Sequence, residues 1–170
     1  AYIAKWRGAL SIPDDCDRTK FTSFLKSQSD NGIKEMKKAK KGEYNAEKGR
    51  YYYIPDRTKL DGYDLSSSGL KTFKVNLLAA YKRVLTMATG YACMSEAEKS
   101  SSDGTELLNA TLGSLDFLLK YYSMEWDILY ESKQQWTDTQ FNIPIVAGNI
   151  LCLMYDKMSE AEIKEYTDQI

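Results

Sequence analysis

Histidine is absent from this 170-residue sequence. Histidine is the commonest general base near neutral pH, the usual partner of a nucleophilic serine or cysteine, and a frequent zinc ligand. Its absence excludes the commonest ways in which this chain alone would catalyse a reaction. The sequence also has no phosphate-binding loop, nucleophile elbow or metal-ligand spacing, so we expect neither a cofactor nor a metal.

Cysteines are few and far apart in the sequence. They are Cys16, Cys93 and Cys152, with no CxxC pair, so their spacing indicates neither a metal site nor a redox pair. We therefore expect each cysteine to be a small buried apolar side chain.

The sequence also lacks an excess of one charge and any long apolar run. Lys and Arg number 23 and Asp and Glu 24, which gives a net charge of −1. A dedicated nucleic-acid-binding domain is basic, so we expect no nucleic-acid partner. No apolar run approaches the roughly 20 residues of a membrane span, and the N-terminal residues lack the apolar region of a signal peptide. The length predicts a single domain over residues 1–170.

Apolar residues recur every three or four positions in two segments, which predicts two strongly amphipathic helices. The residues of this pattern are Leu70, Phe73, Leu77, Tyr81, Val84 and Ala88 in the first segment, and Leu108, Leu112, Leu115, Leu119 and Tyr122 in the second.

Four further helices are expected, at residues 2–10, at about 17–41, from Pro144 with Val146, Ile150 and Leu153 apolar, and from the capping box Ser159–Glu162. Asp30-Asn31-Gly32 is expected to break or kink the helix at about residues 17–41. Residues 42–65 and 95–104 are expected to be irregular, and Tyr51–Ile54 has β-propensity but no evident partner strand. The predicted fold class is all-α, built from antiparallel helical hairpins.

The segment Glu131–Asn142 holds the best candidate for a binding site. It places Trp136 among Gln, Thr, Asp and Asn side chains between two helices. An aromatic ring can stack on the C–H face of a sugar while neighbouring amides bind its hydroxyl groups. The alternative interpretation is a loop tryptophan that packs on the core.

Two other features each allow two interpretations. Lys34–Arg50 carries seven cations and three acids, which suits either attraction of a polyanion or a solvated helix face. The tyrosines either line a ligand groove or pack a wrapping loop onto the helices. They are Tyr51, Tyr52, Tyr53 and Tyr63.

Several segments, in order, resemble the family 8 polysaccharide lyases, which include the hyaluronate, chondroitin AC and xanthan lyases. Tyr2–Leu10, with Lys5-Trp6-Arg7, is similar to their N-terminal Trp-Arg helix. Asp64–Ser68 resembles their Leu-Ser-Ser segment, and Leu115–Leu118 resembles their Leu-Asp-Trp-Leu helix. The most specific resemblance lies near the C-terminus. Its segments are Gln135–Pro144, similar to Asn-Trp-Trp-x-x-Glu-Ile-Gly-x-Pro, and then Asn149–Met154 and Ser159–Asp168.

The resemblance implies part of an incomplete (α/α) toroid whose cleft binds an acidic polysaccharide such as hyaluronan or chondroitin. It implies that Trp136 and Gln135 match the family's first Trp and the preceding Asn, whereas Thr137 replaces the second Trp and Gln140 replaces the Glu. Family members use Asn, His and Tyr for β-elimination, and these lie beyond the position matching Ile170. We therefore expect this chain to supply substrate-binding residues and no catalytic residue.

The resemblance further implies that the remainder of a parent lyase chain is a partner. It also implies that the protein acts outside the cytoplasm, being extracellular, periplasmic or at the cell surface. The alternative function is a non-catalytic helical glycan-binding or scaffolding module. A helical protein-interaction array would show sequence repeats, and the sequence has none.

Overall fold

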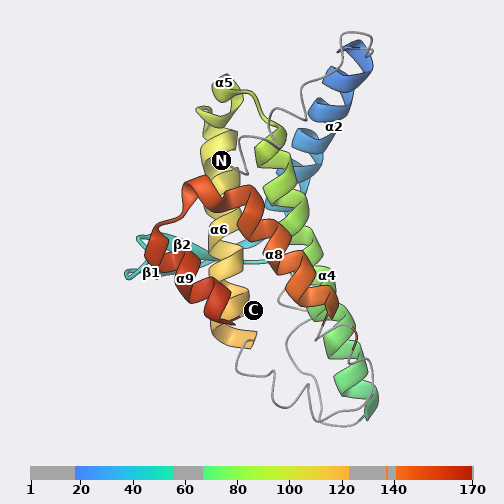
Figure 1. The fold of residues 1–170 in the computed structure, drawn as a ribbon, viewed down its shortest axis with the longest axis vertical. Coiled ribbons are helices and arrows are strands. Elements are labelled where there is room, and N and C mark those ends of the chain that lie inside the picture. Colours follow the sequence, from blue (N-terminus) through green and yellow to red (C-terminus); the bar gives the residue numbers. More distant parts are fainter. Residues whose placement is uncertain (1–17, 56–66, 123–136, 138–140, 170) are drawn as a thin grey trace.

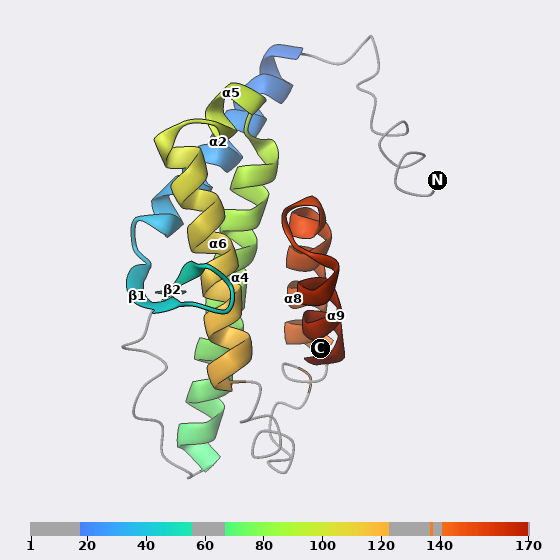
Figure 2. The same cartoon turned by 90° about the vertical axis from the view of Figure 1, so that its left-hand side faces the viewer.

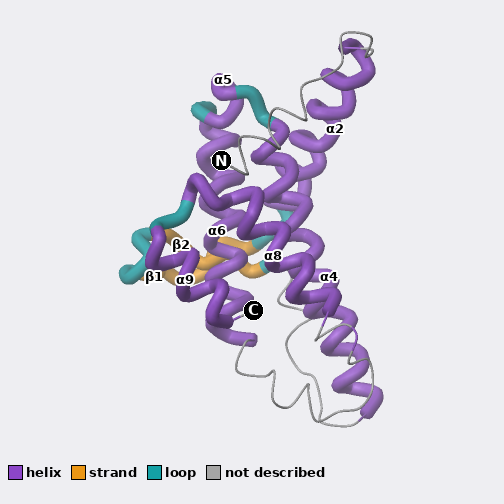
Figure 3. Tube along the Cα trace, viewed as in Figure 1, coloured by secondary structure: helices purple, strands orange, loops and turns teal. Residues whose placement is uncertain are grey.

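The computed structural model of the chain describes residues 18–55, 67–122, 137 and 141–169. Within these ranges the chain is mostly helical with one small two-stranded sheet (Figure 1, Figure 3), which confirms the predicted helical class. The elements are α2 (Arg18–Met36), β1 (Lys40–Asn45), β2 (Arg50–Ile54), α4 (Ser67–Cys93), α5 (Glu96–Lys99), α6 (Ser102–Tyr122), α8 (Ile143–Met154), the 3₁₀ turn η3 (Tyr155–Lys157) and α9 (Glu160–Gln169).

Successive long helices run in opposite directions. In Figure 1, α4 rises, α6 returns beside it, α8 rises across them and α9 returns. Figure 2 shows α2, α4 and α6 together, with α8 and α9 forming a second layer on one side of them. The described helices are therefore arranged as antiparallel hairpins.

The core lies between α4, α6 and α8. The predicted α4 residues Leu77, Tyr81, Val84 and Ala88 are all almost completely buried. Leu112, Leu115 and Leu119 of α6 are buried as well, and α8 adds Ile143, Val146 and Ile150. Their three- and four-residue spacing keeps one side of each helix in the core, as the sequence predicted.

One predicted core residue of α8 is exposed. Leu153 is 40% exposed, whereas Met154 is completely buried. The buried face of α8 continues from Ile150 to Met154, a step of four residues, so Leu153 lies outside it. The prediction was wrong because periodicity alone does not distinguish a step of three from a step of four.

The predicted break at Asp30-Asn31-Gly32 is absent, because α2 continues through these residues to Met36. Gly32 instead lies against Gly90 of α4, where a Cβ atom added to Gly32 would be 2.8 Å from the Gly90 Cα atom. Such a distance leaves no room for a side chain on either residue. This glycine therefore permits two helix backbones to approach closely.

A β-hairpin occupies part of the segment expected to be irregular. β1 and β2 are antiparallel, with Tyr44 opposite Tyr51 and an irregularity between Lys41 and Tyr44. A partner strand for β2 was not evident from the sequence because β1 has the sequence Lys-Lys-Gly-Glu-Tyr-Asn, which has low β-propensity. The hairpin is held against α6, where a Cβ atom on Gly113 would be 2.1 Å from the carbonyl oxygen of Tyr51.

Capping boxes begin two of the helices. At α9 the Ser159 N–H donates to the Glu162 carboxylate (2.8 Å), and the Glu162 N–H donates to Ser159 Oγ (3.3 Å), as predicted. The same arrangement joins Ser95 and Glu98 at α5. The expectation of an irregular segment at 95–104 was therefore wrong, because this cap stabilises a short helix there.

The cysteine prediction is wrong for Cys152, which is exposed on α8. Cys93, at the end of α4, is partly exposed, and burial raises the pKa of its thiol. Cys16 lies outside the described residues. None of the helices in the described ranges is both long and apolar enough to cross a membrane.

Candidate functional site

Three positions of the predicted sugar-binding segment are among the described residues, namely Thr137, Phe141 and Asn142. Trp136, Gln135 and Gln140 lie outside the described residues, and Thr137 is exposed. The helix that follows, α8, begins at Ile143 with a proline in its first turn. The structure thus fixes the position of the helix that follows this segment.

The beginning of α8 presents apolar side chains to solvent. Phe141 and Ile145 are 51% and 59% exposed, whereas Ile143 between them is completely buried. Ile143 anchors this end of α8 in the core. The exposed pair therefore spans the junction between the end of the predicted sugar-binding segment, which includes Phe141, and the anchored first turn of α8, which includes Ile145.

A second candidate site is a cluster of charged and phenolic side chains that joins three elements. Arg50 of β2 donates from Nε and Nη2 to the two carboxylate oxygens of Asp116 on α6, at 2.7 and 3.1 Å. Its Nη2 also donates to Glu162 (2.5 Å) and to the Tyr166 hydroxyl (2.9 Å), both on α9. The Tyr166 hydroxyl donates to Asp116. We call these four residues the Arg50 cluster.

Burial and charge set the protonation states within the Arg50 cluster. Burial opposes the charge of Arg50, but the hydrogen bond and charge of Asp116 outweigh it and raise the arginine pKa. Burial, followed by the Asp116 charge, raises the pKa of Tyr166. Burial also opposes ionisation of Glu162, yet hydrogen bonds from Ser159 and Arg50 lower its pKa. At neutral pH Arg50 is therefore a cation, Glu162 a carboxylate and Tyr166 a neutral phenol.

The Arg50 cluster connects parts of the protein and leaves little capacity for a ligand. The Asp116 side chain is 3% exposed and that of Arg50 12%. The Nε and Nη2 groups of Arg50 form a bidentate hydrogen bond with Asp116, so this pair of donors is not available to a substrate carboxylate. Beside it, Lys48 pairs with Glu165 and lies 5.2 Å from the centre of the Tyr166 ring. These contacts dock both α9 and the hairpin onto α6.

The Arg50 cluster was not predicted from the sequence. In the sequence, Glu162 is accounted for by the capping box, and Arg50 is one of seven cations in the segment Lys34–Arg50, for which two interpretations are open. The available indication was Asp116, a charge within the apolar run Leu115-Asp-Phe-Leu118 on a helix. A buried charge needs a partner of opposite sign. The position of Asp116 therefore predicts a cationic partner but does not identify which residue it is.

The other lysines of the basic segment are exposed, which fits both a solvated face and the attraction of a polyanion. Lys34, Lys37, Lys38, Lys40 and Lys41 are all exposed. At the C-terminal end of the segment, Lys48 and Arg50 are held in ion pairs, so neither interpretation describes these two residues.

The tyrosines divide between core and surface. Tyr52 and Tyr53 are 5% and 4% exposed, which confirms the packing interpretation for them, and Tyr53 donates a hydrogen bond to Glu106. Tyr51 is 42% exposed, and Tyr63 lies outside the described residues.

Tyr51 contacts the side chains of two residues of β1, and together they form an exposed cluster. Its ring centre lies 5.0 Å from that of Tyr44 in an edge-to-face arrangement, and the ammonium nitrogen of Lys41 lies 4.0 Å from it. Tyr44 is 54% exposed. We call Lys41, Tyr44 and Tyr51 the hairpin surface.

In the part of the chain that the structure describes, no group of three or more Cys, Asp or Glu side chains is placed to hold a metal ion. Comparisons with protein-family models, with curated proteins and with solved structures found no match. The residues themselves therefore carry the functional argument.

Proposed function

We propose that this chain is the N-terminal helical part of a polysaccharide lyase that cleaves uronic-acid polymers by β-elimination. The observation that carries the proposal is the ordered resemblance to family 8 lyases, above all Gln135–Pro144 followed in register by Asn149–Met154 and Ser159–Asp168. Two structural observations support it. Successive helices are antiparallel, and Pro144 and the Ser159 capping box begin α8 and α9.

The chemistry of β-elimination explains why a chain of this kind would bind without cleaving. The C5 proton of a uronic acid is weakly acidic, so a donor must neutralise the neighbouring carboxylate. A base must then remove the proton, and an acid must protonate the leaving glycosidic oxygen. This chain has no histidine. In the proposal, the base therefore comes from residues that follow this chain.

The proposed contribution of this chain is to position the sugar. Trp136 stacks on the C–H face of a ring, and the amides of Gln135 and Gln140 bind hydroxyl groups. The exposure of Thr137 supports this arrangement, because it leaves that part of the segment accessible to a ligand. The apolar beginning of α8, with Phe141 and Ile145 exposed, extends the accessible surface.

Tryptophan fluorescence of this chain tests the proposed binding. Hyaluronan or chondroitin oligosaccharides should change the emission in a saturable way, and Trp136→Phe should remove that change. Trp126→Phe removes another of the three tryptophans of the sequence; it is the control and should retain the change. A response to neutral dextran oligosaccharides of equal size, or one that survives Trp136→Phe, would contradict the proposed role of Trp136. The chain alone should release no unsaturated product.

A non-catalytic glycan-binding module is the second candidate function. The departures from the lyase pattern favour it, since Thr137 replaces the second Trp and Gln140 replaces the Glu. The protein sequence that follows Ile170 in the parent separates the two candidates. An Asn, then a His and a Tyr, on the following helices would favour the lyase, and their absence would favour the module.

A further inference from the structure

The hairpin surface combines the two features that recognise an anionic sugar chain. Tyr44 and Tyr51 expose large parts of their rings, and Lys41 places its ammonium group 4.0 Å from the Tyr51 ring centre. Aromatic rings accept the C–H face of a pyranose, and a neighbouring ammonium group attracts its carboxylate. Side chains held against one another in this way need little ordering when a ligand binds.

Positive charge surrounds the hairpin surface. Residues 37–45 carry four lysines and one glutamate. Lys38 pairs with Glu35 at 2.6 Å, but in the described part of the chain Lys37, Lys40 and Lys41 form no salt bridge. The surface therefore retains uncompensated positive charge beside its exposed tyrosines, although the whole chain has a net charge of −1.

The hairpin surface also stands on a rigid support. The Tyr51 carbonyl packs against Gly113 of α6, and Arg50, the preceding residue, is bound to Asp116 of the same helix. Figure 1 and Figure 3 show the two strands at the edge of the molecule beside α6. A site on such a support keeps its geometry without a ligand.

We propose that the hairpin surface is a second binding site for the carboxylate-bearing polysaccharide, made of residues other than those around Trp136. Tyr44 supplies the stacking platform, Tyr51 holds Lys41 in place, and Lys41 binds a uronic-acid carboxylate, while the charges of Lys37 and Lys40 add long-range attraction for the anionic polymer. The choice of ligand rests on the proposed function. The site itself rests on the exposure, contacts and charge of the hairpin.

Affinity electrophoresis through gels containing hyaluronan tests this proposal. The experiment uses the chain with Trp136→Ala, so that retardation reports the hairpin surface alone. That protein should be retarded by hyaluronan and not by neutral dextran, and Lys41→Ala/Tyr44→Ala should weaken its binding about tenfold or more. The matched control Lys157→Ala/Tyr155→Ala removes one exposed lysine and one exposed tyrosine from η3. It should leave retardation unchanged.

Other results of this experiment would overturn either the proposed site or the proposed ligand. Absence of retardation after Trp136→Ala, or equal loss in the two double variants, would show that the hairpin surface does not bind the polymer. Tighter binding to a single-stranded DNA of matched charge would overturn the choice of ligand. Lyase activity and the fluorescence response of Trp136 do not depend on these results, so failure here is distinguishable from failure of the proposed function.

Discussion

Gly32 of α2 and Gly90 of α4 lie backbone to backbone. A Cβ atom on Gly90 would be 2.7 Å from the Gly32 Cα atom and 3.0 Å from the Gln28 carbonyl oxygen. Backbone atoms on both sides of the contact cannot move aside as a flexible side chain would. We therefore expect Gly90→Ala to push α2 and α4 apart and to lower the free energy of unfolding by about 1–3 kcal/mol, measured by urea denaturation.

Gly148 of α8 provides the matched control for this contact. Outside its own helix backbone, no atom of the described residues lies within 4 Å of a Cβ atom added there. Alanine in an open helix interior is favoured over glycine by about 0.5–1 kcal/mol, so Gly148→Ala should stabilise the protein. Equal effects of the two substitutions would show that helix propensity, and not close packing, decides the result at Gly90.

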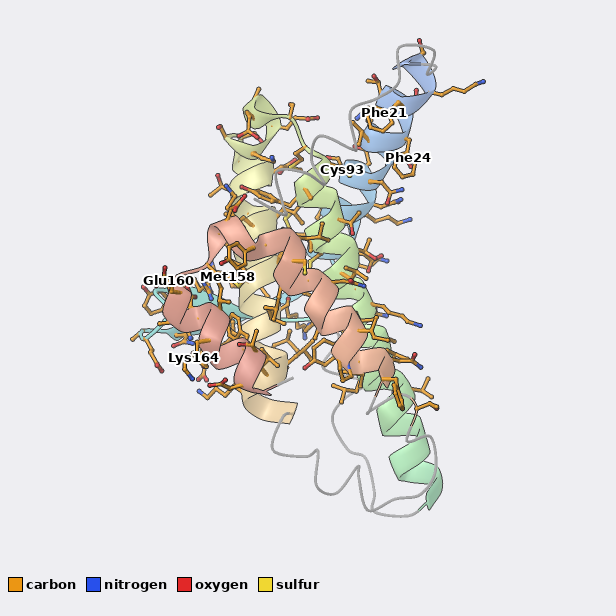
Figure 4. The ribbon with its side chains drawn as sticks, in the orientation of Figure 1. Phe21, Phe24, Cys93, Met158, Glu160 and Lys164 are labelled. Atoms are coloured by element: carbon orange, nitrogen blue, oxygen red, sulfur yellow. The ribbon has the colours of Figure 1, made fainter. Side chains whose placement is uncertain are left out.

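The Arg50 cluster predicts a large cost for breaking a buried ion pair. Arg50→Met leaves the carboxylate of Asp116 buried without its cation, which should lower the free energy of unfolding by about 3–5 kcal/mol. Lys164→Ala removes an exposed ion pair with Asp168 on the outside of α9 (Figure 4) and should have almost no effect. Thermal unfolding followed by circular dichroism compares the two variants. Similar values would indicate that α9 does not depend on the Arg50 cluster.

Glu162 predicts a loss of stability in acid. Its pKa is lowered in the folded protein, so its stabilising contribution is complete above its ordinary pKa of about 4.3 and disappears as the pH falls through the lowered value. The difference in unfolding free energy between the wild type and Glu162→Gln should therefore be largest near pH 6 and shrink below about pH 4. A difference that is constant with pH would exclude ionised Glu162 as its cause.

Tyr81 predicts a stabilising substitution. Its side chain is almost completely buried, and within the described part of the chain its hydroxyl has no hydrogen-bond partner. An unpaired buried hydroxyl costs about 1–3 kcal/mol, so Tyr81→Phe should raise the free energy of unfolding. The control Tyr166→Phe removes a hydroxyl that is bound to Arg50 and Asp116 and should lower it. Destabilisation by Tyr81→Phe would mean that its hydroxyl is paired.

The helices that could be predicted are those whose packing faces repeat along the sequence. Leu77, Tyr81 and Val84 recur with the period of a helix, and that period alone places them on one face of α4. The capping box at Ser159 was equally local, because its two partners lie three residues apart. Both predictions depended on spacing within one element.

The hairpin and the Arg50 cluster could not be predicted in this way. β1 is polar and becomes a strand through its pairing with β2, which in turn packs on Gly113. Arg50 lies 66 residues from Asp116 and 112 from Glu162. Such contacts follow from tertiary packing, which single-sequence periodicity does not encode. The predicted Trp136 subsite remains a prediction, with only Thr137 among the described residues.

The proposed lyase is tested most directly by its own reaction. The protein that contains this chain together with the residues that follow it should release unsaturated, ultraviolet-absorbing product from hyaluronan or chondroitin. Trp136→Ala should lower kcat/KM about tenfold through lost stacking, whereas Tyr155→Ala, at an exposed tyrosine of η3, should not change it. Absence of unsaturated product with every uronic-acid polymer, or an unchanged kcat/KM for Trp136→Ala, would contradict the proposal.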